Sequence, residues 1–560
     1  MRRFLIAAAA LAVVAIVPST ASAAGFSYGV ASADVTSTSA LLWAHAPKAG
    51  KAHLEVALDS RFTRKRIAKT VFAKKANDLT VQSRVAGLIP GRRYYFFFHE
   101  GAKRSVLGTF KTAPKPTTPA TVRFAVTGDT DGFKTSNAIP FYNQQGFYGP
   151  FGSNSFEVFK RMAAEKNDFN VNLGDTMYSE APEKSITEDV ALGPTAFSLA
   201  AKRAKYRQNL SYANLQKVRS SGAMFNHWDD HEFNDDFTPN SAACMYGRVF
   251  DEDKDAAQCN EKQVYAAGVK AFREYMPVTY SSANGIYRRF KWGKNVELFF
   301  LDERSFRSIH ASEVKVDPNA AEPTAHVCDN EGQADPAPQV PQRIRDLFTF
   351  IYPPAKNPPP QACLDAINDP SRTMLGTAQY NAFTNAIKAS KATWKVVVNE
   401  VPIMGAYVNP YDDWQGYMAE RQKLLHFLQD NVKNVVFLTT DFHSNWVADA
   451  SYSVFPEEGG LQPSGIMDFV GGGVADGTFG YEIDDFTDKQ DNWKLINGAF
   501  YAKPPPDGPG MLCSNPVTYG YLQVSAAARK LSVALKDSKG KTITDIGSAK
   551  PCGPYVLTAK

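Results

Sequence analysis

Phe169-Asn-Val-Asn-Leu173, followed at once by Gly174-Asp-Thr-Met-Tyr178, is an apolar strand that ends in a glycine–aspartate turn. Two other stretches repeat this arrangement. Thr127-Gly128-Asp129-Thr130-Asp131 follows a candidate strand at 122–126, and Thr439-Thr440-Asp441-Phe442-His443 follows another at 435–438. Helical stretches separate these strands, which is typical of a central sheet that carries a site at its strand ends. The sequence therefore predicts an α/β domain with aspartates gathered along one edge of a sheet.

These strand ends are rich in metal-ligand types. A single Gly-Asp pair is usually a turn or a helix cap. Together, however, the three turns would bring several carboxylates, an imidazole and a phenol to one edge, where unpaired carboxylates repel one another unless cations are bound. Two more polar clusters add to them: Asn226-His227-Trp228-Asp229-Asp230-His231-Glu232, and Asn399-Glu400-Val401-Pro402 after a candidate strand at 394–398. A cluster of hard metal ions is the expected occupant.

The same residues resemble the calcineurin-like metallophosphoesterase superfamily, and within it the PhoD-like alkaline phosphatase branch. The signatures are Gly174-Asp175-x-x-Tyr178, Trp228-Asp229-Asp230-His231-Glu232, Asn399-Glu400-Val401-Pro402, Asp413-Trp414-x-Gly416-Tyr417 and Asp441-x-His443-Ser444-x-Trp446. The resemblance spans most of the chain. It implies a four-layer α/β/β/α catalytic domain in which a metal-activated hydroxide attacks phosphorus.

The resemblance also implies a ligand set. The expected ligands are Asp129, Asp175, Tyr178, Asp230, Asn399, Asp441 and His443. Asp175 would bridge two ions, and His231 would act as an acid or contact the phosphate. The branch implies iron with calcium, with zinc or manganese as alternatives. It commonly has a cysteine at the first motif, where this chain has Gly128-Asp129, whereas the related purple acid phosphatases have an aspartate there. The exchange suits a hard ferric ion but leaves the metal open.

Arg304 and Arg307 follow a candidate strand at 296–301. Their guanidinium groups could grip a phosphate in a bidentate manner. Alternatively, they could form structural ion pairs with Asp302 or Glu303. The sequence leaves both interpretations open, and the first would add Arg304 and Arg307 to Asp175 and His231 as catalytic residues.

An all-β region precedes the catalytic domain. Short β-rich runs with turn residues fill 24–114 and predict a sandwich similar to fibronectin type III domains. A proline-rich linker then leads into the catalytic domain at 120–560, which carries an insertion near 316–370 tied by a disulfide.

The N-terminus predicts export. Residues 1–23 combine Arg2-Arg3, a short apolar stretch and Ala21-Ser22-Ala23, which is typical of a cleaved signal peptide, with Sec and twin-arginine routes both open. We expect a secreted or periplasmic protein without a transmembrane anchor after cleavage. The six cysteines then favour three disulfides, Cys244–Cys259, Cys328–Cys363 and Cys513–Cys552.

Charge and motifs exclude several other functions. A net charge of +5 over 560 residues implies no nucleic-acid-binding surface. Gly25-Phe-Ser27-Tyr-Gly29 matches a serine-hydrolase motif, but it lies beside the predicted cleavage point rather than between a strand and a helix. The expected substrate is a phosphate mono- or diester, either a small molecule or a phospholipid or nucleotide. A secreted binding or adhesion protein with a decayed phosphoesterase domain is the alternative.

Overall fold

The computed structural model describes residues 25–130, 156–179, 198–239, 261–315, 327–328, 336–475, 477–487 and 491–560. Several predictions fall outside the described residues: the export signal at 1–23, the Cys244–Cys259 bridge, Asp131 and part of the 316–370 insertion. Within the described ranges, no helix combines the length and apolar character needed to cross a membrane.

The strands are short and, in the catalytic domain, mostly buried. Their bounds are β1 (Ser27–Ala33), β2 (Ser39–His45), β3 (Gly50–Ala57), β4 (Ile67–Ala73), β5 (Thr80–Ala86), β6 (Arg93–Glu100), β7 (Lys103–Arg104), β8 (Gly108–Lys111), β9 (Val122–Thr127), β10 (Phe169–Leu173), β11 (Ala223–His227), β12 (Arg288–Trp292), β13 (Val296–Phe300), β14 (Trp394–Val398), β15 (Val435–Thr439), β16 (Asn445–Asp449), β17 (Met467–Val470), β18 (Cys513–Asn515), β19 (Gly520–Ala526), β20 (Lys530–Asp537) and β21 (Tyr555–Thr558). The α-helices are α2 (Glu157–Ala164), α3 (Leu199–Asn209), α4 (Ala213–Ser221), α6 (Glu261–Tyr275), α7 (Gln342–Arg345), α8 (Gln361–Ile367), α9 (Gly376–Ala389), α10 (Met418–Asn431), α11 (Phe479–Phe486) and α12 (Trp493–Ile496).

Two large sheets form the centre of the molecule. One has nine strands in the order β21-β20-β19-β9-β10-β11-β1-β2-β5, and the other has seven in the order β12-β13-β14-β15-β17-β16-β18. Strands β9, β10 and β11 are parallel, as are β13, β14, β15 and β17. Apolar side chains of both sheets, such as Val126 and Phe225 of one and Val398 and Leu438 of the other, share one buried core. The sheets therefore pack face to face.

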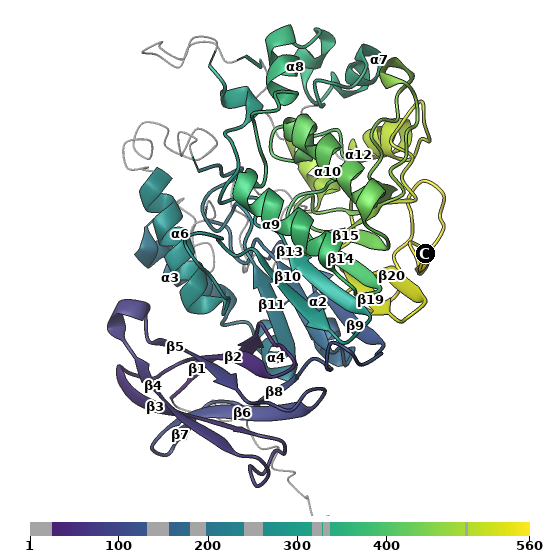
Figure 1. Cartoon of the computed structure of the whole chain (residues 1–560). Helices are drawn as coiled ribbons and strands as arrows, with labels where there is room; N and C mark the ends of the chain where they lie inside the picture. Colours follow the sequence, from purple (N-terminus) through teal and green to yellow (C-terminus); the bar gives the residue numbers. More distant parts are fainter. Residues whose placement is uncertain are drawn as a thin grey trace, which may run out of the picture.

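Helices cover the two outer faces (Figure 1). Phe159 of α2 and Val218 of α4 pack in one cluster with Ala125 of β9, on the outer side of the nine-stranded sheet. On the other side, Phe383 of α9 and Leu424 of α10 pack with Phe437 of β15. These four layers confirm the predicted α/β/β/α fold class.

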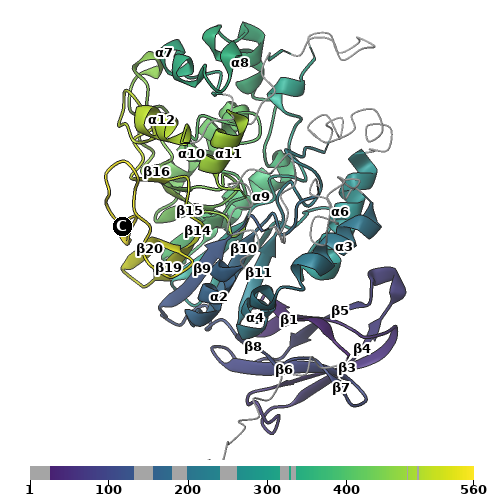
Figure 2. The same ribbon diagram turned by 180° about the vertical axis from the view of Figure 1, so that it is seen from behind.

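The N-terminal strands form the predicted sandwich, which lies at the bottom of the view in Figure 2. Its sheets are β1-β2-β5 and β4-β3-β6, with β7 and β8 paired to β6. The first of these sheets is continuous with the rest of the nine-stranded sheet, because β1 pairs in parallel with β11 at Ser32 and Ala223. The Trp43 indole also donates a hydrogen bond across this junction to the carbonyl of Glu274, at 2.7 Å. One sheet of the sandwich is thus an extension of the nine-stranded sheet; the proposed boundary at 114–120, between β8 and β9, stays a prediction.

Two of the predicted disulfides lie within the described residues. The structure pairs Cys328 with Cys363, and Cys513 with Cys552. The second bridge joins β18 to the segment that precedes β21, and both of its cysteines are buried in the described structure. Both pairings agree with the predicted ones.

Thiol titration tests the complete disulfide prediction. We expect no free thiol in the denatured, unreduced protein, because an exported chain with an even cysteine count oxidises fully. Six equivalents should appear after reduction, matching the cysteine count. Two or more equivalents before reduction would contradict the third bridge, Cys244–Cys259.

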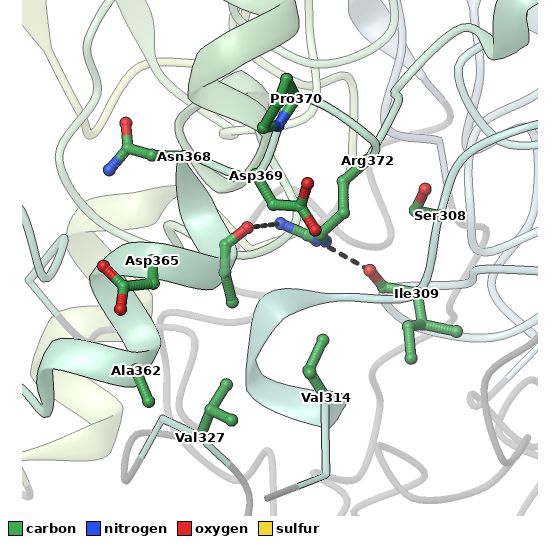
Figure 3. Close-up of a pocket in the computed structure, with 11 residues that line it drawn as sticks. Ser308, Ile309, Val314, Val327, Ala362, Asp365, Asn368, Asp369, Pro370 and Arg372 are labelled. Atoms are coloured by element: carbon green, nitrogen blue, oxygen red, sulfur yellow. Dashed lines mark hydrogen bonds between the residues drawn. The ribbon is translucent and has the colours of Figure 1, made fainter. Parts of the chain in front are cut away.

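A cavity of 680 Å³ adjoins the Cys328–Cys363 bridge, lined in part by Val327, Ala362 and Arg372 (Figure 3). The Arg372 guanidinium donates hydrogen bonds to the carbonyls of Ile309 and Ala366, at 2.8 and 2.9 Å. None of the predicted ligands is among the described residues that line this cavity. The cavity is therefore separate from the predicted metal site.

Candidate metal centre

Four predicted ligands sit in tight turns at strand ends. Asp129 follows β9, Asp175 follows β10, and Asp441 and His443 follow β15; their φ angles are 53°, 46°, 74° and 48°. Such left-handed conformations are uncommon for residues other than glycine, and aspartate tolerates them better than most. Each costs about 1–3 kcal/mol and is typically kept where a site requires it. The turns follow directly after the strands and leave the side chains at one edge.

The first group of ligands comprises Asp129, Asp175 and His443, whose ligand atoms all lie within 4.8 Å of one another. All three side chains are buried. The Tyr178 hydroxyl joins them, because it donates a hydrogen bond to Asp175 Oδ2 at 3.2 Å and lies 2.9 Å from His443 Nε2. Two carboxylates, an imidazole and a phenol from three strand ends thus surround one position.

Two further groups continue from the first. Asp175 also lies within 4.8 Å of Asp230 and His231, and Asp230 in turn lies within that distance of Asp229 and Asp441. Asp175 is therefore shared between neighbouring groups, which is the arrangement that a bridging carboxylate requires. Asp229 was not among the predicted ligands, although its position beside Asp230 in the sequence was the available signal.

Asn399 follows β14 and offers a neutral oxygen. Its amide nitrogen donates a hydrogen bond to the carbonyl of Val401, which leaves the side-chain oxygen facing away. Within the described residues, that buried Oδ1 atom has no hydrogen-bond donor, and the same holds for Asp229 Oδ2. Buried oxygens without donors are costly unless a cation binds them. The residues present therefore fit a metal cluster.

The electrostatics of the site lead to the same conclusion. Burial, together with the negative charges of Asp230 and Asp229, holds the pKa of Asp175 well above its usual range. Burial and the nearby Asp229 and Asp412 carboxylates likewise raise the pKa of Asp441. Cations at the shared positions would offset this repulsion between carboxylates.

Arg304 and Arg307 lie in a buried network of carboxylates. Arg304 is completely buried; it donates to Asp229 Oδ1 at 2.5 Å and pairs through both terminal nitrogens with Asp412. Arg307, 1% exposed, donates to Asp412 Oδ1 at 3.0 Å and to the Asp412 carbonyl. Buried carboxylates hold both guanidinium groups, and their role as phosphate contacts stays a prediction. The alternative, structural ion pairs, is present with other partners than expected, since Asp412 and Asp229 replace Asp302 and Glu303.

Comparison with known proteins identifies the chain. The sequence model of the PhoD-like phosphatase family matches residues 145–503, and that of the family's N-terminal domain matches residues 10–114. This chain belongs to the PhoD-like phosphatase family.

Individual relatives agree with the family assignment. The chain is 27% identical to alkaline phosphatase D of Bacillus subtilis over 456 residues, which cover 76% of this chain and 65% of that protein. The solved structure of PhoD is similar to this chain with a TM-score of 0.66 and 22% sequence identity. The match covers 96% of this chain and 90% of the PhoD chain. A purple acid phosphatase from yellow lupin seeds is similar with a TM-score of 0.53 and 12% sequence identity. The match covers 93% of this chain and 73% of the lupin chain. The two structures support the metallophosphoesterase fold.

His231 has the most exposed side chain among the predicted residues of the Asp129–Asp175–His443 group and the Asp175–Asp230–His231 group. Its side chain is 16% exposed, and its ring lies over Tyr178 with centroids 4.0 Å apart. Nε2 lies 3.7 Å from Asp235 Oδ1, and the backbone N–H donates to Asp175 Oδ1 at 3.3 Å. His231 therefore borders the two candidate ligand groups and is partly exposed. Its role as an acid or phosphate contact stays a prediction.

Buried supports that the sequence did not predict hold the motif turns together. Glu232 accepts hydrogen bonds from the backbone N–H groups of Thr176 and Asp229, at 2.7 and 2.8 Å. The Asn209 amide of α3 donates to the carbonyls of Thr130 and Thr176, at 3.2 and 3.0 Å. Glu232 stands inside a conspicuous acidic motif, whereas nothing in the local sequence distinguishes Asn209.

Proposed function

We propose that this protein is a metal-dependent phosphoesterase. The observation that carries the proposal is the convergence of Asp129, Asp175 and His443 within 4.8 Å, with Asp175 shared by the adjoining group of Asp230 and His231. Membership of the PhoD-like phosphatase family supports it.

The proposed chemistry divides between bound metal ions and side chains. Asp129, Asp175, Tyr178, Asp230, Asn399, Asp441 and His443 would hold the ions, with Asp229 sharing its second oxygen. Metal ions bound there would supply an activated water for attack on phosphorus and positive charge for the phosphoryl oxygens. The partly open His231 would meet a phosphoryl oxygen or give a proton to the leaving alcohol. The products are then the alcohol and a phosphate or phosphomonoester.

We propose iron with calcium as the metals, with zinc or manganese as the alternatives. Asp129 offers a carboxylate where the branch commonly has a thiolate, and Tyr178 adds a phenol. Oxygen ligands of this kind suit a ferric ion and the hard calcium ion.

Colour tests the iron assignment. If ferric iron is bound, Tyr178 should coordinate as phenolate and give a visible charge-transfer band, since a trivalent ion strongly favours the deprotonated phenol. We expect Tyr178→Phe to lose the band while Asp129, Asp175 and His443 keep most of the iron. Absorption spectra and elemental analysis of both proteins measure this. An active, metal-replete protein that is colourless and free of iron would contradict the assignment.

The substrate and location complete the proposal. We propose phosphate mono- or diesters, of the small-molecule, phospholipid or nucleotide class, as substrates. We further propose that the protein is exported to the periplasm or outside the cell; the cysteine pairings Cys328–Cys363 and Cys513–Cys552 support this, because disulfides persist in oxidising compartments.

Hydrolysis of p-nitrophenyl phosphate and bis-p-nitrophenyl phosphate tests the function. The protein is first depleted of metal and then reconstituted with iron and calcium, or separately with zinc or manganese. Release of nitrophenol that depends on added metal supports the proposal, and the ratio of the two rates separates monoester from diester preference. No hydrolysis of either ester by a metal-replete protein would favour a binding protein with a decayed catalytic domain.

A further inference from the structure

Helix α11 (Phe479–Phe486) is pinned beside the turn that carries His443, and it is visible in Figure 2. The Phe479 ring packs against Trp446 with centroids 5.4 Å apart, and its backbone N–H donates to the His443 carbonyl at 3.4 Å. Gly480 allows this close approach, because a Cβ atom there would lie 2.5 Å from Val517 Cγ1 and 2.9 Å from the Pro516 carbonyl. The start of α11 therefore has little room to shift relative to His443.

The first turn of α11 places the Glu482 carboxylate beside Nδ1 of the His443 ring. Glu482 Oε1 lies 2.8 Å from His443 Nδ1. The opposite ring nitrogen, Nε2, lies 2.9 Å from the Tyr178 hydroxyl, which itself contacts Asp175. The Glu482 and His443 side chains are 18% and 10% exposed, so water has limited access to this pair.

This geometry selects one tautomer of the imidazole. A neutral histidine donates from one ring nitrogen and accepts at the other, and a carboxylate can only accept. Glu482 therefore keeps the proton on Nδ1 and leaves the Nε2 lone pair directed at the group formed with Asp129 and Asp175. Histidine ligands of metals commonly use such a partner, whose loss costs about 10–100-fold in metal affinity.

We propose that Glu482 is a positioning residue that orients His443 and fixes its tautomer for metal binding. This inference rests on the proposed metal-dependent function. It adds to the site a residue from a separate helix, 39 positions along the chain from His443.

Metal binding by the metal-depleted protein tests the proposal without reference to activity. Calorimetric titration with Zn²⁺ and with Mn²⁺ should give an affinity weaker by about 10–100-fold in Glu482→Ala. Glu482→Gln should recover much of the affinity, because its amide oxygen can still accept from Nδ1. Asp484→Asn is the matched control from the same helix: the Asp484 carboxylate accepts from the backbone N–H groups of Asp491 and Trp493, at 2.8 and 3.2 Å. The metal affinity of Asp484→Asn should equal that of the parent.

Nitrogen NMR of histidine-labelled protein gives a second readout. The His443 signals, assigned with His443→Ala, should report the Nδ1–H tautomer in the parent and a mixture of tautomers in Glu482→Ala. If Glu482→Ala does not fold, the His443 tautomer in the parent and the metal affinity of Glu482→Gln still test the role of Glu482. A parent that binds no metal would refute the proposed function itself. A parent that binds metal while Glu482→Ala binds equally well, or a parent with the Nε2–H tautomer, would overturn the role of Glu482 alone.

Discussion

Replacing Asp175 by Asn should lower phosphoesterase activity by at least about 10²–10³-fold. Asp175 is the carboxylate shared between the Asp129–His443 group and the Asp230–His231 group. Asparagine has nearly the same shape but carries no charge and offers one oxygen instead of two, so it cannot bridge two cations. The fold should persist, because the change relieves repulsion among buried carboxylates. Parallel assays and elemental analysis should show that activity and bound metal fall together.

Asp168→Asn is the matched control for this prediction. Asp168 lies next to the opposite end of the same strand, β10, where it pairs with Lys111 at 2.5 Å and accepts from the Arg123 N–H at 2.9 Å. Its replacement should leave activity and metal content at the parental values. If Asp175→Asn retains its metal and remains within a few-fold of the parent in rate, Asp175 does not belong to the site.

Arg304→Met should lower the free energy of unfolding by about 3–5 kcal/mol, because removing one partner of a buried ion pair leaves the other charge uncompensated. Arg304 contacts four carboxylates: it donates hydrogen bonds to those of Asp229, Asp412 and Asp441, and it lies 3.5 Å from that of Asp230. Methionine fills much of the volume but carries no charge. Denaturant unfolding of the metal-depleted proteins measures the effect.

Arg343→Met provides the comparison for this loss of stability. Arg343 pairs with Glu457 at 3.1 Å, but both side chains are well exposed, at 39% and 49%. Exposed pairs contribute about 0–1 kcal/mol, so this variant should unfold close to the parent. If Arg304→Met were as stable as the parent but bound substrate more weakly, Arg304 would instead be a phosphate-binding residue.

The strand ends of the catalytic domain could be predicted because the signal is local. Phe169–Leu173 is an unbroken strand in both the prediction and the structure, and Gly174 and Asp175 follow it in a turn that aspartate and glycine favour. The parallel order of β9, β10 and β11 then brings Asp129 and Asp175 to the same edge. A short-range pattern and a general rule for parallel sheets were sufficient for this part of the site.

Long-range partners could not be predicted in the same way. Asp412 lies 108 positions from Arg304, and local sequence made Asp302 and Glu303 the obvious partners instead. In the structure, Asp302 and Glu303 accept hydrogen bonds from the Trp228 and Trp414 indoles, at 3.2 and 2.7 Å. Glu482 lies on a helix whose contact with His443 depends on the packing of Phe479 and Gly480. Such pairings arise from tertiary packing, which leaves no periodic trace in a single sequence.

The pairing of the N-terminal sandwich with the nine-stranded sheet could also not be predicted from local sequence patterns. The sequence around β1 has turn residues on both sides of a short strand, as any strand of a sandwich would. In the structure, however, β1 pairs with β11, about 190 residues along the chain. Its burial from Val30 to Ala33 reflects neighbours on both sides, β11 and β2.

The most direct test of a metal-dependent phosphoesterase is to measure bound metal and bis-p-nitrophenyl phosphate hydrolysis on the same samples during chelation and reconstitution. We expect the purified protein to hold more than one metal ion per chain, to lose hydrolysis in proportion to the metal removed, and to regain it when metal is restored. The Asp175→Asn variant, carried through the same cycle, should regain neither metal nor activity. A fully active protein that contains no metal would contradict the central claim.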